Sequence, residues 1–523
     1  MSNFRYRTIQ VFVAIAFLLI LGRLFQFQIL EGKKHSEITQ RYGKSRTVNP
    51  ARAEIVDRND KVLALDMLKY SLEYNPAETD EDRAELVTKL SEIFPLKDDL
   101  SASYSKVLSH GLSREQANKI RKLNSKLLYL RKIRRRFYPQ DSLAAHLLGY
   151  VDLYGQARQG LEARFQKRLE SEPENKFKLS LDSRLQVFAE KELAKRITET
   201  KAARGTAIVM KVDSGEIYAW AVSPGFNPNQ YFDSSMEQMK NWSLVDVYQP
   251  GSIFKTITVT AALDSATIDL NHRFIDKGFL EVDKWKIKNH EYKPGKTEPA
   301  ELNLQELFER SSNTFAAHLA LAMGPRTFYR YIKKFGFGRE TGIELDGESK
   351  GILLKHKKWR KSDTATTGMG HGAISVTPLQ LLTAVNVIAN NGYKVKPSLL
   401  YGGETLDPQA EPLVDPAVTA SLRELLTRSI DHNLKFKNSV AGRVDNLIIA
   451  GKTGTAEKIK AGGGYSKRET FASFLGFYPA YQPQFITLVV IDDPKTDGRW
   501  GDTVAGPLFN KIAAYVRDLY LSS

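Results

Sequence analysis

The stretch Tyr248-Gln249-Pro250-Gly251-Ser252-Ile253-Phe254-Lys255 places a serine and a lysine in a pattern that indicates chemistry. Pro-Gly favours the end of a loop, so Ser252 is expected at the N-terminus of a helix, with Lys255 on the same face one turn later. A serine hydroxyl is a weak nucleophile until a base takes its proton, and a desolvated lysine amine can act as that base. The helix dipole and the backbone N–H of Ser252 would favour an adjacent oxyanion. The stretch therefore predicts a serine nucleophile with Lys255 as its base.

A second polar stretch, Ser311-Ser312-Asn313, lies further along the chain. The hydroxyl of Ser311 is suited to relaying a proton toward a leaving amine. The Asn313 amide is suited to holding Lys255 or a substrate carbonyl, and Ser312 is interpreted as a spacer. Such a tripeptide arises by chance in many chains, so it carries weight only together with the other stretches.

The third stretch, Lys452-Thr453-Gly454, is followed by Thr455 and preceded by apolar residues. This pattern predicts an edge strand beside the nucleophile. Lys452 would supply a fixed positive charge and Thr453 a hydroxyl for a substrate carboxylate. Gly454 would let the backbone approach the substrate, so that the N–H of Thr455 completes an oxyanion hole.

The composition excludes several classes of protein. The chain has 523 residues, 42% of them hydrophobic, a formal net charge of +16 and no cysteine. Sizeable cores are therefore possible, which excludes a disordered or collagen-like chain. Without cysteine there are no disulfides, no thiolate metal sites and no cysteine nucleophile. The His residues show no metal-ligand spacing, so no metal and no cofactor are expected.

Residues 9–30 predict one transmembrane helix. Val11–Leu21 has no polar side chain, and 22 residues of helix would reach about 33 Å, enough for a bilayer core of about 30 Å. Arg5 and Arg7 come first, so residues 1–8 are predicted to be a cytoplasmic tail and the remaining chain to lie outside the bacterial inner membrane. No small-residue cleavage site follows, which favours an anchor over a signal peptide. We therefore expect no nucleic-acid partner, and the basic excess indicates anionic lipid, wall polymers or a solvated surface.

The remaining chain is predicted to form two domains. Residues 31–175 are rich in charge and show no chemical constellation, and the basic run Lys132–Arg136 is interpreted as an exposed face. The polar stretch Ser171–Asn175 indicates a junction. In residues 176–523 the order of helix, strand pair, many helices, strands and terminal helix predicts an α+β domain, with an antiparallel sheet flanked by helices.

Local signals define several elements of this second domain. Asp182 is predicted to cap a helix, and residues 205–222 read as a hairpin broken at Ser214-Gly215. Thr377-Pro378-Leu379-Gln380 carries the N-cap, first-turn proline and capping box of another helix. Strands over residues 471–478 and 485–491 precede an amphipathic terminal helix.

The three polar stretches, in this order, are the mark of penicillin-binding proteins and serine β-lactamases. The whole chain resembles a class B penicillin-binding protein, a membrane-anchored D,D-transpeptidase of bacterial cell-wall synthesis. Further stretches that carry this resemblance are Arg52–Asp60, Gly160-Leu161-Glu162, Leu181-Asp182, Gly215-Glu216-Ile217, Thr341-Gly342-Ile343 and Thr377–Gln380. Ala53 and Asp60 stand where the family usually has glycine. His371 stands where it often has Gln, so we interpret it as a structural or substrate-side residue, since Lys255 already supplies a base.

The resemblance implies a penicillin-binding, serine β-lactamase-like transpeptidase fold over residues 176–523, preceded by a membrane-proximal α+β pedestal over residues 31–175. It also implies that Ser252 attacks the penultimate D-Ala of a stem peptide ending in D-Ala-D-Ala, and that β-lactams acylate Ser252. Lys255, Ser311, Asn313 and Lys452 would take part in catalysis, while Thr453, Gly454 and Thr455 would bind substrate.

The septal, cell-division type is favoured over the elongation type, because no wall-binding module follows residue 523 and a Gly-rich turn over residues 461–464 joins two strands, as in the septal type. Its expected partners are a transmembrane glycosyltransferase, which polar Gln10 and Arg23 could face, and other proteins of the division complex.

Other functions stay open on the sequence alone. A D,D-carboxypeptidase or β-lactamase of the same fold would share the three stretches but let water resolve the acyl-enzyme. No convincing water-activating Glu is visible. A β-lactam sensor usually has several membrane spans, and a non-catalytic scaffold would not need every catalytic position filled.

Overall fold

The computed structural model describes Phe17, Ile20, Arg23 and residues 50–522 except 77–82, 97, 103, 404–410, 460–463 and 497. The predicted cytoplasmic tail, most of the predicted transmembrane segment and the centre of the Gly-rich turn at 461–464 lie outside these residues. Within the described part of the chain, none of the helices is both long and apolar enough to cross a membrane.

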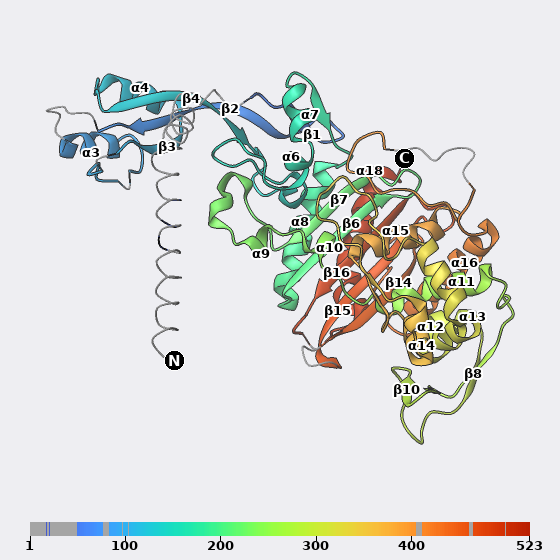
Figure 1. Cartoon of the computed structure of the whole chain (residues 1–523). Coiled ribbons are helices and arrows are strands. Elements are labelled where there is room, and N and C mark those ends of the chain that lie inside the picture. The colour runs from blue at the N-terminus through green and yellow to red at the C-terminus, as the bar shows by residue number, and fades with distance from the viewer. Residues whose placement is uncertain are drawn as a thin grey trace, which may run out of the picture. The chain divides into compact units, whose positions relative to one another are not determined.

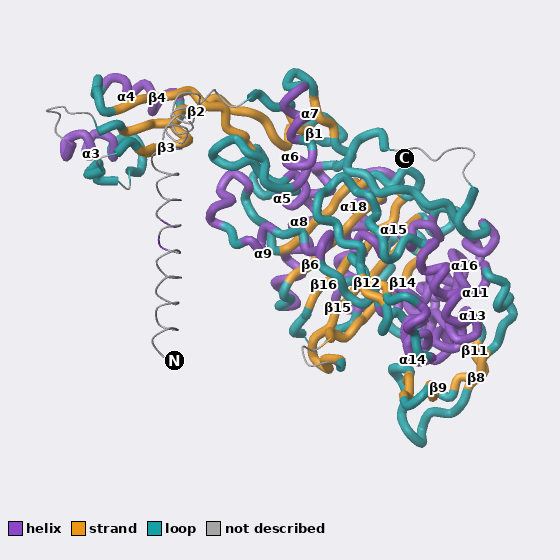
Figure 2. The backbone as a smooth tube through the Cα atoms, in the orientation of Figure 1, coloured by secondary structure: helices purple, strands orange, loops and turns teal. Residues whose placement is uncertain are grey.

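The chain divides into two compact units (Figures 1 and 2). The smaller unit comprises Leu68–Arg135 together with Met1–Ala51, and the larger one Arg52–Met67 together with Arg136–Ser523. The predicted boundary at residue 175 thus lies inside the larger unit. The division into residues 31–175 and 176–523 as functional parts stays a prediction.

The smaller unit packs two helices against antiparallel strands. Strand β2 (Val62–Tyr74) pairs with β3 (Lys106–Leu112) and with β4 (Leu128–Phe137), and both β2 and β4 continue into the larger unit. The helices are α3 (Arg83–Ser91) and α4 (Arg114–Lys122). The side chain of Ser113 accepts a hydrogen bond from the backbone N–H of Gln116, and the Gln116 side chain accepts one from the N–H of Ser113, which fixes the start of α4.

The larger unit begins with a small sheet and short helices. Strand β1 (Glu54–Val56) pairs antiparallel with the start of β2 and parallel with β5 (Lys176–Lys178). The helices here are α5 (Ala145–Leu148), α6 (Gly160–Arg164) and α7 (Gln166–Ser171).

A buried ion cluster holds this region together. Glu162, which is fully buried, pairs with Arg136 at 2.6 Å and with Arg52 at 3.2 Å. Arg136 also lies 3.2 Å from Asp66. The expectation that the basic run ending at Arg136 is an exposed face is therefore wrong for this residue, because its charge is matched by two carboxylates that are far away in sequence.

The stretch with the family signature has structural roles. Both carboxylate oxygens of Asp57 accept hydrogen bonds, from the N–H groups of Asn59 and Lys61 and from Ser183. The guanidinium of Arg58 lies over the ring of Tyr218, 3.6 Å from its centroid. Asp60 has φ +63°, a left-handed conformation that explains why glycine is usual there.

The central sheet has five strands in the order β14-β15-β16-β6-β7, and every neighbouring pair is antiparallel. The strands are β14 (Ala450–Ile459), β15 (Tyr465–Tyr478), β16 (Phe485–Asp492), β6 (Arg204–Lys211) and β7 (Ile217–Ser223). The predicted hairpin and the predicted strands near the C-terminus are confirmed, because alternation and turn residues are local signals. Since β14 is the outermost strand, the third predicted stretch lies at the edge of the sheet.

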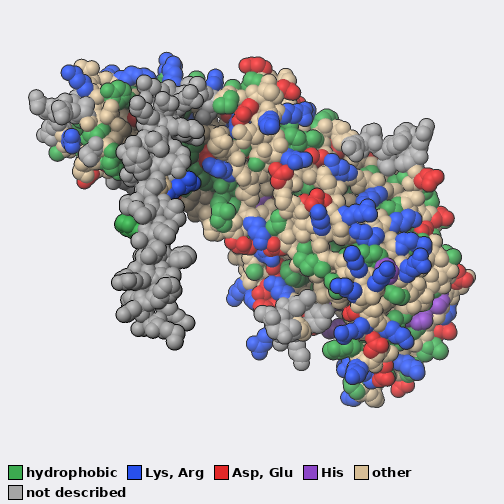
Figure 3. All heavy atoms as spheres, in the orientation of Figure 1, with side chains coloured by type: hydrophobic (Ala, Val, Ile, Leu, Met, Phe, Trp, Pro, Cys, Tyr) green, Lys and Arg blue, Asp and Glu red, His purple; other side chains and the backbone are tan. Residues whose placement is uncertain are grey.

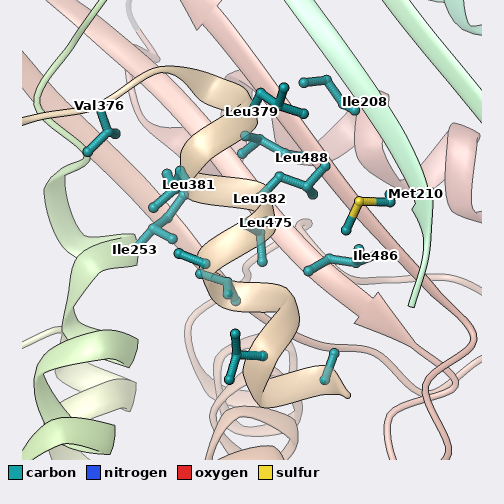
Figure 4. Close-up of a cluster of buried hydrophobic side chains, with 14 of the residues drawn as sticks. Ile208, Met210, Ile253, Val376, Leu379, Leu381, Leu382, Leu475, Ile486 and Leu488 are labelled. Atoms are coloured by element: carbon teal, nitrogen blue, oxygen red, sulfur yellow. The ribbon is translucent and has the colours of Figure 1, made fainter. Parts of the chain in front are cut away.

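Helices cover both faces of this sheet. On one face Val209 and Phe474 pack with α8 (Ser183–Thr200) and α18 (Gly506–Tyr520). On the other, Ile208 and Leu488 pack against Leu379 and Leu382 of α15 (Pro378–Ala389), as Figure 4 shows. The strands therefore alternate between two cores, as expected for a sheet buried on both sides.

The predicted helix starts are confirmed by their caps. The carboxylate of Asp182 accepts a hydrogen bond from the N–H of Arg184 at the start of α8. At α15 the Thr377 hydroxyl accepts from the N–H of Gln380, whose side chain accepts from the N–H of Thr377.

A helical lobe lies beside β14 (Figure 1). Its helices are η3 (Gly251–Phe254), α11 (Lys255–Asp264), α12 (Leu304–Arg310), α13 (Asn313–Lys334), η4 (His356–Lys358), α14 (Lys361–Gly368) and α16 (Pro416–Phe436). Short strands join them: β8 (Phe274–Asp276), β9 (Phe279–Val282), β10 (Trp285–Lys288), β11 (Ala300–Leu302), β12 (Ile352–Leu353) and β13 (Ile374–Ser375). The remaining short helices of the larger unit are η2 (Pro228–Asp233), α9 (Met236–Met239), α10 (Trp242–Val245) and α17 (Gly501–Val504).

Candidate active site

Ser252 and Lys255 lie where a tight helical turn passes into α11. Ser252 is the second residue of η3, and Lys255 is the first residue of α11. The backbone N–H of Lys255 donates to the carbonyl oxygens of Ser252 and Ile253, so the two side chains stand one turn apart. Ser252 is half-buried, whereas Lys255 is fully buried. The local structure is thus a helix start, as the Pro-Gly pair predicts, with a 3₁₀ turn in place of the first α-helical turn.

The ammonium group of Lys255 joins the first and second predicted stretches. Its Nζ donates to the carbonyl oxygen of Ser311 at 2.6 Å and to Oδ1 of Asn313 at 2.7 Å. A third contact, at 3.2 Å, reaches the Ser311 hydroxyl. The buried amine of Lys255 therefore contacts residues more than fifty positions away in sequence.

The surroundings of Lys255 favour its neutral form. Burial lowers its pKa well below the ordinary value, because the charged ammonium loses its hydration. The nearby charge of Lys452 lowers the pKa further, and Asp276 opposes the shift. A neutral amine can accept a proton, so the environment supplies what a general base requires.

Asp276 and Asn289 hold the second stretch in place, and the sequence analysis missed both. Oδ2 of the buried Asp276 accepts hydrogen bonds from the Ser312 hydroxyl at 2.6 Å and from the Asn289 amide at 2.8 Å. Oδ1 of Asn289 accepts from the N–H of Asn313 at 2.8 Å. No short pattern signals these two residues, because their partners are contributed by other elements.

Ser312 is a helix cap and not merely a spacer. Its hydroxyl accepts a hydrogen bond from the N–H of Phe315 at the start of α13. The preceding residue, Ser311, has φ +51°, a left-handed conformation that ends α12 and turns its carbonyl oxygen toward Lys255. A non-glycine residue in this region stores strain, which the surrounding hydrogen bonds must offset.

Strand β14 runs directly beside η3, and glycines allow the approach. A Cβ added to Gly251 would lie 2.9 Å from the carbonyl oxygen of Thr455. A Cβ added to Gly454 would lie 3.1 Å from the side chain of Ile253. The third stretch is therefore brought against the turn that carries Ser252, as predicted for an edge strand next to a nucleophile.

Lys452 is buried near the start of this strand, and its charge depends on pH. Its exposed fraction is 5%, and its Nζ donates to the hydroxyl and the carbonyl oxygen of Thr453, each at 3.2 Å. Burial lowers its pKa to about 7, and the charge of Lys437 contributes. Among the described residues no carboxylate pairs with it. The fixed positive charge expected of Lys452 stays a prediction, and the lowered pKa makes this charge sensitive to pH.

Gly501 and Trp500 close the other side of β14, and both were missed by the sequence analysis. The N–H of Gly501 donates to the Thr455 hydroxyl at 3.1 Å. A Cβ added to Gly501 would lie 2.5 Å from the carbonyl oxygen of Gly454. The ring of Trp500 meets that of His290 edge to face, with centroids 4.5 Å apart, so the loop after Asn289 contacts the loop before α17.

His371 lies in a loop that packs on the turn that carries Ser252. The N–H of Gly251 donates to the carbonyl oxygen of Gly370 at 3.1 Å, and a Cβ on Gly370 would collide with the carbonyl of Gly251. Burial lowers the pKa of His371 to about 4, so the ring is neutral at neutral pH. Within the residues that the structure describes, no three acidic or His side chains gather as metal ligands would.

Two family models match the chain. Residues 205–514 match the penicillin binding protein transpeptidase domain, and residues 47–183 match the penicillin-binding protein dimerisation domain. The first match alone covers more than half of the chain.

Curated proteins from several bacteria are similar over nearly the whole chain. Stage V sporulation protein D of Bacillus subtilis is 30% identical, with 96% of this chain and 83% of that protein covered. Peptidoglycan D,D-transpeptidase FtsI of Escherichia coli is 29% identical, with 96% and 89% covered. Probable peptidoglycan D,D-transpeptidase PenA of Neisseria meningitidis is 28% identical, with 98% and 92% covered.

Solved structures share the fold. A crystal structure of penicillin binding protein 3 from Mycobacterium tuberculosis, complexed with aztreonam, superposes with a TM-score of 0.70 at 23% identity. The superposition covers 90% of this chain and 96% of the Mycobacterium tuberculosis chain. A peptidoglycan synthetase from Bifidobacterium adolescentis gives a TM-score of 0.69 at 23% identity, with 91% and 96% covered.

Proposed function

This chain belongs to the penicillin-binding protein transpeptidase family, and we propose that it cross-links peptidoglycan stem peptides through an acyl-enzyme on Ser252. One observation carries the proposal. The buried amine of Lys255 lies one turn from Ser252 and contacts both Ser311 and Asn313, while β14 brings Lys452 and Thr453 alongside. A nucleophile, a base, a relay and a cation thus meet in one site.

In the acylation step, Oγ of Ser252 attacks the carbonyl carbon of the penultimate D-Ala as its proton passes to the neutral amine of Lys255. The carbonyl oxygen becomes an oxyanion, which the N–H groups of Ser252 and Thr455 would stabilise. The carbon–nitrogen bond then breaks. The leaving D-Ala amine takes a proton through the Ser311 hydroxyl, and an ester on Ser252 remains.

In the second step, the amine of a neighbouring stem attacks this ester. Its proton passes to the same base, the bond to Oγ of Ser252 breaks, and Oγ recovers a proton. The product is an amide that joins two stems, and the enzyme returns to its starting state. Because the same groups serve both steps in reverse order, no further residue is required.

Lys452 and Thr453 would bind the terminal carboxylate of the donor stem. A carboxylate beside a buried, unpaired amine favours the protonated form, so substrate binding itself would charge Lys452. A β-lactam presents a carboxylate and a reactive amide in a similar arrangement, which accounts for acylation of Ser252 by these drugs.

We further propose that the chain is a single-pass protein of the bacterial inner membrane, with its catalytic part outside the cytoplasm. The apolar run within residues 9–30 and the preceding Arg5 and Arg7 support this topology. The likeness to FtsI and to a sporulation protein supports a role in septal wall synthesis. In that role a transmembrane glycosyltransferase and other proteins of the division complex would be its partners.

Labelling with a fluorescent penicillin tests the acyl-transfer chemistry. The wild-type chain should become labelled, mass spectrometry should map the adduct to the peptide containing Ser252, and Ser252→Ala should abolish it. Absence of labelling in the wild-type chain would refute the proposal.

Incubation with stem peptides and an amine acceptor distinguishes the related activities. Cross-linked dimers support the transpeptidase. Release of D-Ala without dimers would indicate a D,D-carboxypeptidase, rapid hydrolysis of the drug a β-lactamase, and a stable adduct without any turnover a sensor or scaffold.

A further inference from the structure

A basic cavity lies in the helical lobe, at the end of α13 opposite Asn313. Its volume is about 640 Å³. Figure 3 shows Lys and Arg side chains gathered over this lobe. The cavity is lined by Arg326, Thr327, Tyr329, Arg330, Lys333, Arg339 and His356. Four of these side chains are cationic at neutral pH, and no carboxylate is among them.

The four cations have no acidic partners within the described residues. Arg326, Arg330, Lys333 and Arg339 form no ion pair there, and the Nζ of Lys333 reaches only the carbonyl oxygen of Gly338, at 3.4 Å. Two lysines outside the lining do have acidic partners. Lys334 lies 3.9 Å from Asp264, and Lys350 lies 3.7 Å from Glu340. Four cations without an ion pair among the described residues therefore line one cavity.

These cations also repel one another. Burial lowers the pKa of Lys333, and the charge of Arg339 lowers it further. Lys394, which reaches toward Gly336, is affected in the same way by burial and by Arg339. Bringing cations together without anions raises the free energy of the folded state, and a bound anion would remove that penalty.

The wall of the cavity carries an unused polar atom. Nδ1 of His356 is buried and has no hydrogen-bond partner among the described residues. The ring is held by aromatic contacts, with the His356 and Tyr329 centroids 4.9 Å apart and those of Tyr329 and Trp359 5.9 Å apart. Buried polar atoms are rarely left unpaired, so this atom calls for a ligand or a solvent partner.

We propose that this cavity is a binding site for a diphosphate or a longer phosphate chain. Guanidinium groups pair with phosphate oxygens through two parallel hydrogen bonds, and the two exposed arginines, Arg326 and Arg330, stand one turn apart on α13. A single carboxylate would leave most of the four charges unmatched, whereas a diphosphate carries several charges in a compact group. Thr327 and His356 add further polar groups to the same wall.

The site is separate from the one that contains Ser252. Asn313 begins α13, and Arg326 comes thirteen residues later, about 20 Å along a helix. Gly324, with φ +72°, interrupts the helix between them, so the C-terminal half that carries the cations is an independent segment. The inference therefore does not depend on the proposed transpeptidase activity.

Calorimetry with inorganic pyrophosphate and tripolyphosphate, using the full chain in detergent at constant ionic strength, tests the proposal. The wild-type chain should bind both more tightly than sulfate. The double variant Arg326→Gln/Arg330→Gln should lose affinity by about tenfold or more. Both arginines are exposed, so the variant should fold, and unchanged labelling by fluorescent penicillin would verify this.

A matched control uses Lys334→Gln and Lys357→Gln, which remove two exposed lysines of the same lobe outside the lining. These should change affinity by less than about twofold, because neither side chain lines the cavity. An equal loss in the control, or no preference for pyrophosphate over sulfate, would overturn the proposal.

The source of the phosphate is decided by comparing inorganic pyrophosphate with a short-chain phosphatidic acid below its micelle concentration. Preference for pyrophosphate indicates a soluble phosphate compound, and preference for the lipid indicates a headgroup. A preference for pyrophosphate that is lost in the double variant supports the site, whereas a preference for the monophosphate lipid would overturn the diphosphate proposal. Binding of neither ligand would refute it.

Discussion

At the scale of single residues, the proposed mechanism gives two buried lysines opposite tasks. Lys255 must be neutral to accept a proton, and Lys452 must be charged to attract a carboxylate. The charge of Lys452 lowers the pKa of Lys255, and only Lys255 has the carboxylate of Asp276 as a compensating charge. Lys452 has no such carboxylate partner in the described structure. The substrate carboxylate can supply the missing negative charge.

Replacing Lys255 by methionine should lower the rate of acylation by about a hundredfold or more, because the base is lost while the shape of the side chain is kept. Stopped-flow measurement with a chromogenic β-lactam would follow the rate. The thermal unfolding midpoint should fall only modestly, because methionine fills a similar volume. Lys334→Met is the matched control, and a near-normal rate in Lys255→Met would mean that another residue is the base.

The pH dependence of acylation should reveal Lys452. Its pKa in the folded state is about 7, below the ordinary lysine value of 10.5, so the free enzyme loses this proton as pH rises through 7. The second-order rate constant for an anionic β-lactam should therefore decline on the alkaline side of about pH 7. Lys452→Arg, which keeps its charge, should move this decline to higher pH. An unchanged profile would show that Lys452 does not govern carboxylate binding.

At the scale of secondary-structure elements, the site depends on how closely β14 and its neighbours approach. Glycines at 251, 454 and 501 lie at these contacts, and each would place a Cβ against backbone or a packed side chain. The oxyanion position that we propose for Thr455 is set by this packing, and a shift of a fraction of an ångström would alter it.

Gly501→Ala should slow acylation by about tenfold or more without touching Ser252, because the added methyl group would collide with the carbonyl oxygen of Ser473, lie 2.5 Å from that of Gly454 and so displace β14 and β15. Gly225→Ala is the control, since nothing lies within 4 Å of a Cβ there. Acylation kinetics and thermal unfolding of both variants would decide the matter. Equal rates in both variants would contradict the proposed role of strand position.

The sequence predicted the elements whose signals are local. The capping residues Asp182 and Thr377, the hairpin at Ser214-Gly215 and the terminal strands all follow from neighbours within a few positions. Asp276, Asn289 and Gly501 could not be predicted in this way, because their partners come together only when distant elements pack. The same applies to Arg136, which is buried only because Glu162 and Asp66 lie nearby in the folded chain.

At the scale of the whole molecule, the larger unit contains two segments of chain, one before and one after residues 68–135 of the smaller unit. Arg52–Met67 and Arg136–Ser523 form one compact body, and the ion cluster around Glu162 ties the two segments together. The predicted boundary at residue 175 follows a change in composition, whereas compactness depends on contacts that composition does not reveal.

Arg136→Met should reduce the free energy of unfolding by about 3–5 kcal/mol, because it leaves the fully buried Glu162 with a single cationic partner. Chemical denaturation of the purified chain would measure the loss. Arg164→Met, which removes an exposed pair with Asp346, should leave stability nearly unchanged. Similar stabilities for the two variants would mean that the buried cluster contributes little.

Because β14 ends its ladder, no strand among the described residues pairs with one side of its main chain. An extended ligand along this free edge would form hydrogen bonds between its own peptide groups and those of β14, whatever its side chains. Selectivity would then rest on the ligand's charged terminus, which Lys452 is placed to meet. Such an enzyme would accept different side chains in the middle of the stem peptide and would require a particular C-terminus.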